Sequence, residues 1–316
     1  MQSHPFRADG PPTGGTIGKG ARVQRTFLRS ISYELMGLLI FVAIFHLLSA
    51  IGAALDETGL LLVSLVMAVV PALLWLAVFY RMDRAEPEPK QLVLGVYLTG
   101  LLLMAALYQP LFGVLFAMEG WLRVYWWSHL LGGVLVTGMA SMAIVYAAVR
   151  IVAFNNPEFD ERLDGVIYAV AAGLGVATVH NFVYVVRYGG VDLDVGSIRI
   201  VVNALGYAGV AGMLGYFIGQ ARFEKTSVFY LPAGVVLSAA LLGLYFFLIE
   251  QTASTGLRAE FWRHLLLGLF LTLLIMGAVS WLVRRANEET ARVAQLAATG
   301  DRWEPKPVEI ASDRGE

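Results

Sequence analysis

Long apolar runs alternate with short polar stretches along most of this 316-residue chain. A helix needs about 20 mainly apolar residues to cross the hydrocarbon core of a bilayer. Stretches of that length, each without a charge near its middle, cover approximately residues 33–54, 60–80, 91–117, 128–153, 163–187, 199–220, 229–250 and 262–284. The pattern predicts an all-α fold, a polytopic membrane helix bundle of about eight transmembrane helices.

Both ends of the chain are more polar than the rest. Residues 1–30 are rich in Gly, Pro and charge and have no apolar core that would serve as a secretory signal, so we expect a disordered cytoplasmic tail. Residues 31–285 form the predicted transmembrane domain, and residues 286–316 form a second cytoplasmic tail. This second tail begins with a helical extension that is expected to stop at Gly300.

Lys and Arg are distributed unevenly between the two sides of the predicted bundle. With the N-terminus inside, 18 of the 23 fall on the inner side, so the positive-inside rule places both termini in the cytoplasm. The outer connections carry an aromatic belt of the kind found at membrane interfaces, made of Trp121, Tyr125, Trp126 and Trp127.

Composition narrows the chemistry further. Hydrophobic residues make up 58% and charged residues 15% of the chain, whereas a soluble domain has about 25% charged residues. Cysteine is absent from the sequence, which excludes disulfides, thiolate nucleophiles and cysteine-ligated metals. A net charge of −1 without a basic arm argues against nucleic acid as a partner.

The most informative stretch runs from Pro157 to Tyr184, where an acidic loop leads into a long apolar segment that ends near His180 and Asn181. Polar residues within a membrane are costly and usually functional. For His180 the favoured interpretation is a hydrogen bond to a neighbouring helix, and the alternative is a remnant ligand or base. Tyr184 shares its helix face at i+4, so these side chains can bind one another or a substrate backbone.

Three motifs together resemble the PrsW family of intramembrane proteases, which are of glutamic or metallo type. They are PALLWLAVFYRMDRAEPEP from Pro71 to Pro89, PEFDERLDGVIYAVAAGLGVATVHN from Pro157 to Asn181, and GYFIGQARF from Gly215 to Phe223. The resemblance covers roughly residues 60 to 285. It implies a multi-pass protein of the bacterial inner (plasma) membrane.

The resemblance also implies where the active site would lie. The paired glutamates and the lysine of the family motif map to Ser141, Met142 and Val145. A later glutamate maps to His180, whereas the neighbouring asparagine is kept as Asn181. The polar positions of the next two helices map to Tyr207, Leu242 and Phe246. These are former active-site positions with replaced side chains, so we assign no catalytic residue, no metal ligand and no cofactor.

Elementary chemistry supports the same expectation. Peptide hydrolysis needs an activated water, and hence a positioned carboxylate or a metal with several ligands. The acidic residues of the spans lie at helix ends, and the histidines come from different helices without a paired motif. These residues are Glu34, Asp164 and Glu250, and His46, His129, His180 and His264. Ser141 has no activating base beside it in sequence, and a serine in a membrane helix commonly bonds its own backbone.

Glycines recur along two of the predicted helices, namely Gly173, Gly175, Gly206, Gly209, Gly212, Gly215 and Gly219. Close packing of helices is the favoured role. The alternative is a groove left open for a transmembrane segment of a substrate. The acidic loop at Pro157 and the turn RMDRAEPEP are expected to have structural roles, as a helix cap and an ion-paired stop.

The leading hypothesis is a PrsW-like homologue that has lost proteolytic activity and acts as a binding or regulatory membrane protein. Its expected partners are membrane lipids and a transmembrane helix of another membrane protein. The first alternative is an active intramembrane endopeptidase with relocated catalytic residues, such as His180. The second is a small transporter or lipid-handling protein, which the lack of charge at mid-depth disfavours.

Overall fold

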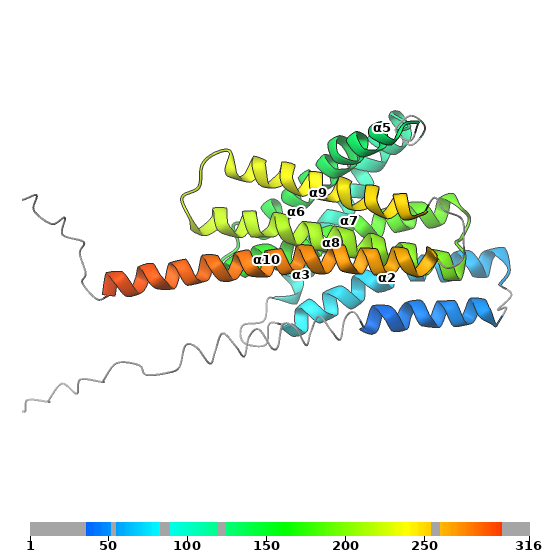
Figure 1. Ribbon diagram of the computed structural model, residues 1–316, viewed down its shortest axis with the longest axis horizontal. Helices are drawn as coiled ribbons and strands as arrows, with labels where there is room; N and C mark the ends of the chain where they lie inside the picture. The colour runs from blue at the N-terminus through cyan, green and yellow to red at the C-terminus, as the bar shows by residue number, and fades with distance from the viewer. Residues whose placement is uncertain are drawn as a thin grey trace, which may run out of the picture.

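The computed structural model describes residues 36–51, 55–82, 89–118, 120, 124–253 and 260–298, and the regular structure in these ranges is helical. An N-terminal helix at Met36–Ala50 is followed by α2 (Glu57–Met82), α3 (Lys90–Leu103), η1 (Met104–Leu115), α5 (Trp126–Gly132), η2 (Gly133–Gly138), α6 (Met139–Val152), α7 (Arg162–Arg187), α8 (Leu193–Phe223), α9 (Tyr230–Ala253) and α10 (Glu260–Ala298) (Figure 1). The segments η1 and η2 are π-helices that continue α3 and join α5 to α6.

In the part of the chain that the structure describes, seven helical segments are long and apolar enough to cross a membrane. They are Glu57–Ala77, Lys90–Leu115, Trp126–Val152, Arg162–Arg187, Leu193–Phe223, Tyr230–Gln251 and Trp262–Ala286. The first predicted span corresponds to the shorter apolar helix Met36–Ala50, and residues 33–35 and 52–54 lie outside the described ranges. The predicted all-α membrane helix bundle is confirmed.

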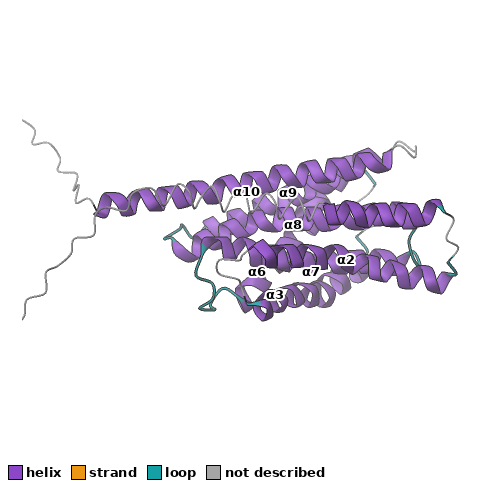
Figure 2. Ribbon diagram, turned by 90° about the horizontal axis from the view of Figure 1, so that it is seen from below, coloured by secondary structure: helices purple, strands orange, loops and turns teal. Residues whose placement is uncertain are grey.

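Helices α7 and α8 form the centre of the bundle. In each of them, 83% of the most apolar 18-residue stretch is buried inside the protein, whereas in the other five spans the buried share is 33%. Figure 2 shows α3 on one side of this pair and α10 on the other. Residues on α7 and α8 are therefore enclosed by protein, while the outer helices present much of their surface to lipid.

Glycines bring the backbones of these helices together. A Cβ atom on Gly165 of α7 would lie 2.6 Å from the backbone N of Gly219 on α8, and one on Gly173 would lie 2.6 Å from the Ala211 Cβ. Gly175 faces the backbone of α3 at Tyr97. Earlier along α8, Gly206, Gly209 and Gly212 meet side chains of α9 and α10, namely Tyr245, Thr272 and Met276. The close-packing interpretation is confirmed, because the chain's own helices fill these faces and leave no groove there.

One end of the α7–α8 pair is closed by polar contacts from the acidic loop. The Asp164 carboxylate accepts hydrogen bonds from the backbone N–H groups of Asp160 at 3.0 Å and Glu161 at 2.7 Å. Arg162 forms an ion pair with Glu224 at 2.7 Å, which joins the start of α7 to the end of α8. These contacts give the loop the expected structural role. The turn at 81–90 falls largely outside the described residues.

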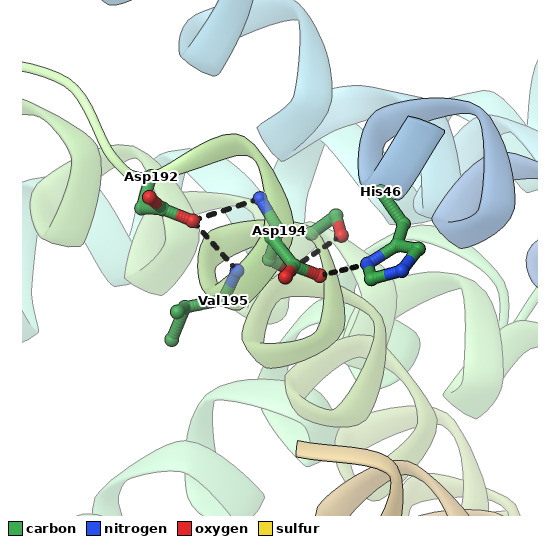
Figure 3. A network of polar contacts seen from close by, with 5 residues as sticks. His46, Asp192, Asp194 and Val195 are labelled. Carbon is green, nitrogen blue, oxygen red and sulfur yellow. Dashed lines mark hydrogen bonds and ion pairs between the residues drawn. The ribbon is translucent and has the colours of Figure 1, made fainter. Parts of the chain in front are cut away.

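At the opposite end, two histidine–carboxylate pairs join peripheral helices to the bundle. His46 Nδ1 lies 2.7 Å from Asp194 Oδ1, and Asp192 caps α8 by accepting bonds from the backbone N–H groups of Asp194 and Val195 (Figure 3). His129 Nε2 lies 2.8 Å from Glu250 Oε2 and thereby links α5 to α9. Two of the histidines considered as candidate bases thus pair with carboxylates at helix ends.

The aromatic belt and the helical extension also have counterparts in the structure. Tyr125, Trp126 and Trp127 at the start of α5 are exposed, and Trp121 lies outside the described residues. Helix α10 continues to Ala298 and runs beyond the bundle at the end where α8 stops (Figure 1). This matches the helical extension expected after Arg285.

We predict that Gly165→Ala destabilises the protein by about 1 to 3 kcal/mol, because the new methyl group would overlap the α8 backbone. Thermal unfolding in detergent measures the effect. The matched control is Gly277→Ala, where nothing lies within 4 Å of the added carbon. Equal unfolding temperatures for the two variants would contradict the close α7–α8 contact.

Candidate functional site

The positions to which the resemblance maps the family's paired glutamates and lysine lie on one buried stretch of α6. Ser141, Met142 and Val145 have no measurable exposure. The Ser141 Oγ atom lies 3.5 Å from the hydroxyl oxygen of Tyr207 on α8, which is at the long limit of a hydrogen bond. The chain thus has a serine, in contact with a tyrosine, where the resemblance expects one of the paired glutamates.

His180 on α7 is held between two tyrosines. Its ring stacks on Tyr207 with centroids 5.2 Å apart and planes 19° apart, and it meets Tyr108 edge-on at 5.4 Å. Phe246 of α9 packs against the other side of this group, 5.4 Å from Tyr207. The His180 Nε2 atom is buried and has no hydrogen-bond partner within the described ranges. The favoured interpretation of His180 as hydrogen-bonded to a neighbouring helix is therefore wrong for this nitrogen.

Tyr108 was not among the residues that the sequence suggested. It lies on η1, and its hydroxyl donates a hydrogen bond at 3.2 Å to Thr137 on η2. Both segments are π-helical, a geometry that is rare and frequent at functional sites. Nothing in the hydrophobic period marks a π-turn, although Pro110 indicates that regular α-helix is interrupted there.

Asn181 turns away from His180 and binds α8. The Asn203 amide donates to Asn181 Oδ1 at 2.8 Å, and the Asn181 amide donates to the carbonyl of Ile200 at 3.4 Å. Tyr184 lies beneath the Arg199 guanidinium, whose carbon is 4.1 Å from the ring centre. The polar residues near the end of α7 therefore serve separate contacts. Asn203 was missed, although an asparagine inside an apolar run is itself a signal.

The structure brings several of the mapped positions together. Ser141, His180 and Tyr207 form a chain of contacts across α6, α7 and α8. Leu242 is buried on α9, one turn before Phe246. We give the name His180 pocket to this group of buried and partly buried side chains, which consists of Ser141, His180, Tyr207, Tyr108 and Phe246. It carries hydroxyl groups and one imidazole but no carboxylate.

Comparison with known proteins decides the family. The model of the PrsW family intramembrane metalloproteases matches residues 88–293. This chain belongs to the PrsW family. The matched range contains the second and third sequence motifs, whereas the motif from Pro71 to Pro89 lies almost wholly before it.

Curated relatives agree with this assignment. The protein named Protease PrsW of Geobacillus kaustophilus is 29% identical over 217 residues, which are 67% of this chain and 87% of the relative. Protease PrsW of Bacillus subtilis is 24% identical over 59% of this chain and 82% of the relative. That of Clostridioides difficile is 26% identical over 58% of this chain and 77% of the relative. No solved structure matches the chain. The protein is therefore a multi-pass membrane protein and a PrsW-like intramembrane protease homologue.

The family description implies a metal ion, and the residues of the His180 pocket do not fit one. A catalytic zinc site uses three protein ligands and a water molecule. Within the described ranges, no group of three or more His, Cys, Asp or Glu side chains is placed to hold a metal. His180 Nε2 is the atom of the pocket that could bind a metal, since it is buried and has no hydrogen-bond partner among the described residues. The rings beside His180 are those of Tyr108 and Tyr207, which carry hydroxyl groups and no carboxylate.

We predict that Asn181 and Asn203 are energetically coupled, because replacing either residue removes the hydrogen bond from the Asn203 amide to Asn181 Oδ1. A double-mutant cycle of Asn181→Leu and Asn203→Leu, followed by unfolding in detergent, is expected to give a coupling free energy of about 0.6 to 1.7 kcal/mol. The cycle of Asn203→Leu with Thr99→Val serves as the control, because Thr99 bonds its own helix at Gly95. Coupling as small as in the control would argue against the Asn181–Asn203 bond.

Proposed function

We propose that this chain is a catalytically inactive member of the PrsW family that acts as a binding or regulatory membrane protein. One observation carries the proposal. At two of the positions to which the resemblance maps the family's glutamates stand Ser141 and His180, and both side chains contact Tyr207, so that no carboxylate is among the three.

Chemistry supports this interpretation. Hydrolysis of a peptide bond needs a base that takes a proton from water, or a metal that acidifies it. His180 is the sole strong base among the residues that make up the pocket, and no acidic side chain in the pocket orients it or stabilises its charged form. A lone imidazole between two phenol rings is a poor site for activating water.

A partner would bind on the lipid-facing surface, because the glycine faces are filled by the chain's own helices. Helix α3 offers one such surface, with Leu94, Leu98 and Leu102 exposed along a single stripe at 51%, 43% and 62%. Without water to drive association, helices in membranes pair by close van der Waals contact. We propose that membrane lipids and a transmembrane helix of another membrane protein are the partners.

A second candidate function is an active intramembrane endopeptidase with relocated catalytic residues. The buried Nε2 atom of His180, which has no hydrogen-bond partner among the described residues, favours it. In that case His180 acts as the base, and its removal abolishes cleavage.

The two candidates differ in a reconstituted cleavage assay on transmembrane peptides. We expect no turnover by the wild type and no stoichiometric zinc by elemental analysis, because the pocket offers one strong ligand. Protease PrsW of Geobacillus kaustophilus, assayed in parallel, controls for the assay conditions. Turnover that disappears in His180→Ala would reject the inactive-homologue proposal and support the endopeptidase.

The binding role is tested separately by photocrosslinking in membranes. A crosslinker at Leu102 is expected to capture a membrane protein, and the matched control is Leu174, which is fully buried on α7. The partner surface would be contradicted if crosslinkers at Leu102 and Leu174 captured the same material. It would also be contradicted if no membrane protein were captured at Leu94, Leu98 or Leu102.

We also propose that the protein lies in the bacterial inner membrane with both termini in the cytoplasm. Eighteen of the 23 Lys and Arg residues fall on the proposed inner side. The seven spans together with the helix at Met36–Ala50 make an even number of crossings, which puts both termini on one side. In this arrangement residues 1–30 and 286–316 are cytoplasmic tails of the domain at 31–285.

Reporter fusions test this topology. Fusions at Glu119 and Gly256 are expected to show periplasmic activity, and one at Asn155, between α6 and α7, cytoplasmic activity. The charge asymmetry is the physical reason, since Lys- and Arg-rich connections resist translocation. A cytoplasmic reading at either of the first two sites would overturn the orientation.

A further inference from the structure

Two arginines from different helices share one aromatic ring. The guanidinium carbon of Arg150, in the last turn of α6, lies 4.0 Å from the centre of the Phe154 ring. That of Arg222, in the last turn of α8, lies 5.4 Å from the same centre and 5.7 Å from the Phe159 ring. Cation–π contacts of this kind fix the orientation of each guanidinium.

Within the described ranges, neither arginine has a carboxylate at ion-pair distance. The nearest acid in sequence to Arg222 is Glu224, and its carboxylate is bound to Arg162 at 2.7 Å. Two like charges held around one ring repel each other, and an anion between them would remove that repulsion. A favourable helix dipole accounts for one arginine in the last turn of each helix, but it does not account for their meeting on the same ring.

The pair lies where a membrane-spanning helix leaves the hydrocarbon. The spans Trp126–Val152 and Leu193–Phe223 both end within two residues of these arginines. Each arginine is followed by an exposed apolar side chain, Ile151 at 70% and Phe223 at 41%. An amphiphile at this point would have its charged group beside the two guanidiniums and its apolar part beside Ile151 and Phe223.

We propose that Arg150, Arg222 and Phe154 form a binding site for the phosphate group of an anionic phospholipid. The planar guanidinium donates paired N–H groups that match phosphate oxygens. Basic pockets between transmembrane helices are suited to lipid headgroups. Glu158 and Asp160 flank Phe159 in sequence and are exposed, so their charge favours a phosphodiester with a single negative charge over a polyphosphate headgroup.

Titration in nanodiscs tests the site. The full chain is placed in phosphatidylcholine nanodiscs with increasing fractions of phosphatidylglycerol, and native mass spectrometry measures the fraction at which lipid retention is half-maximal. Each of Arg150→Gln and Arg222→Gln is expected to raise this fraction about fivefold. Phe154→Leu is expected to raise this fraction less, because both positive charges remain and only the aromatic ring that the two guanidiniums contact is lost.

The matched control is Arg199→Gln at the opposite end of α8, since Arg199 also lies on an aromatic ring, that of Tyr184. It is expected to behave like the wild type. An equal rise in Arg199→Gln, or no rise in the Arg150→Gln and Arg222→Gln double variant, would overturn the site. If inorganic phosphate competes equally well with phosphatidylglycerol for the site, the result would show a general anion site instead of a lipid site.

Discussion

The close approach of α7 and α8 sets the relative positions of His180 and Tyr207 in the His180 pocket. Gly165, Gly215 and Gly219 let the two backbones meet without side chains between them. Because lipid tails are as apolar as leucine, such contact has to come from shape and dispersion instead of from the hydrophobic effect. The contact fixes the register of the two helices, and this register brings His180 level with Tyr207.

The His180 pocket shows how a membrane protein can retain a buried polar centre without charge. Each polar side chain there is either packed on a ring or bonded to a neighbouring helix, as Tyr108 is to Thr137. Hydroxyl groups and aliphatic side chains at these positions avoid the cost of burying ionised groups. The aromatic contacts of the pocket join η1, α7, α8 and α9, and the Ser141–Tyr207 contact adds α6.

The sequence predicted the architecture well because spans are long and strongly apolar. It also predicted that glycines serve packing, and the resemblance correctly brought Ser141, His180 and Tyr207 together. Side-chain partners across helices were harder. The sequence did not indicate that Asn181 binds Asn203, because the neighbour of a side chain on another helix depends on how the two helices are rotated and aligned. Tyr108 was missed for a related reason, since its direction depends on π-helical turns.

Those π-helical turns have an implication for how the chain varies. A π-turn accommodates an additional residue within an otherwise α-helical span. Loss of a single residue between Met104 and Leu115 would remove one of the extra residues that η1 accommodates without breaking the span, and the residues before it would rotate by about 100° relative to those after it. Tyr108 would then leave the His180 ring while the hydrophobic length changed by about 1.5 Å. Insertion or deletion of one residue here would therefore reshape the pocket and keep the same membrane topology.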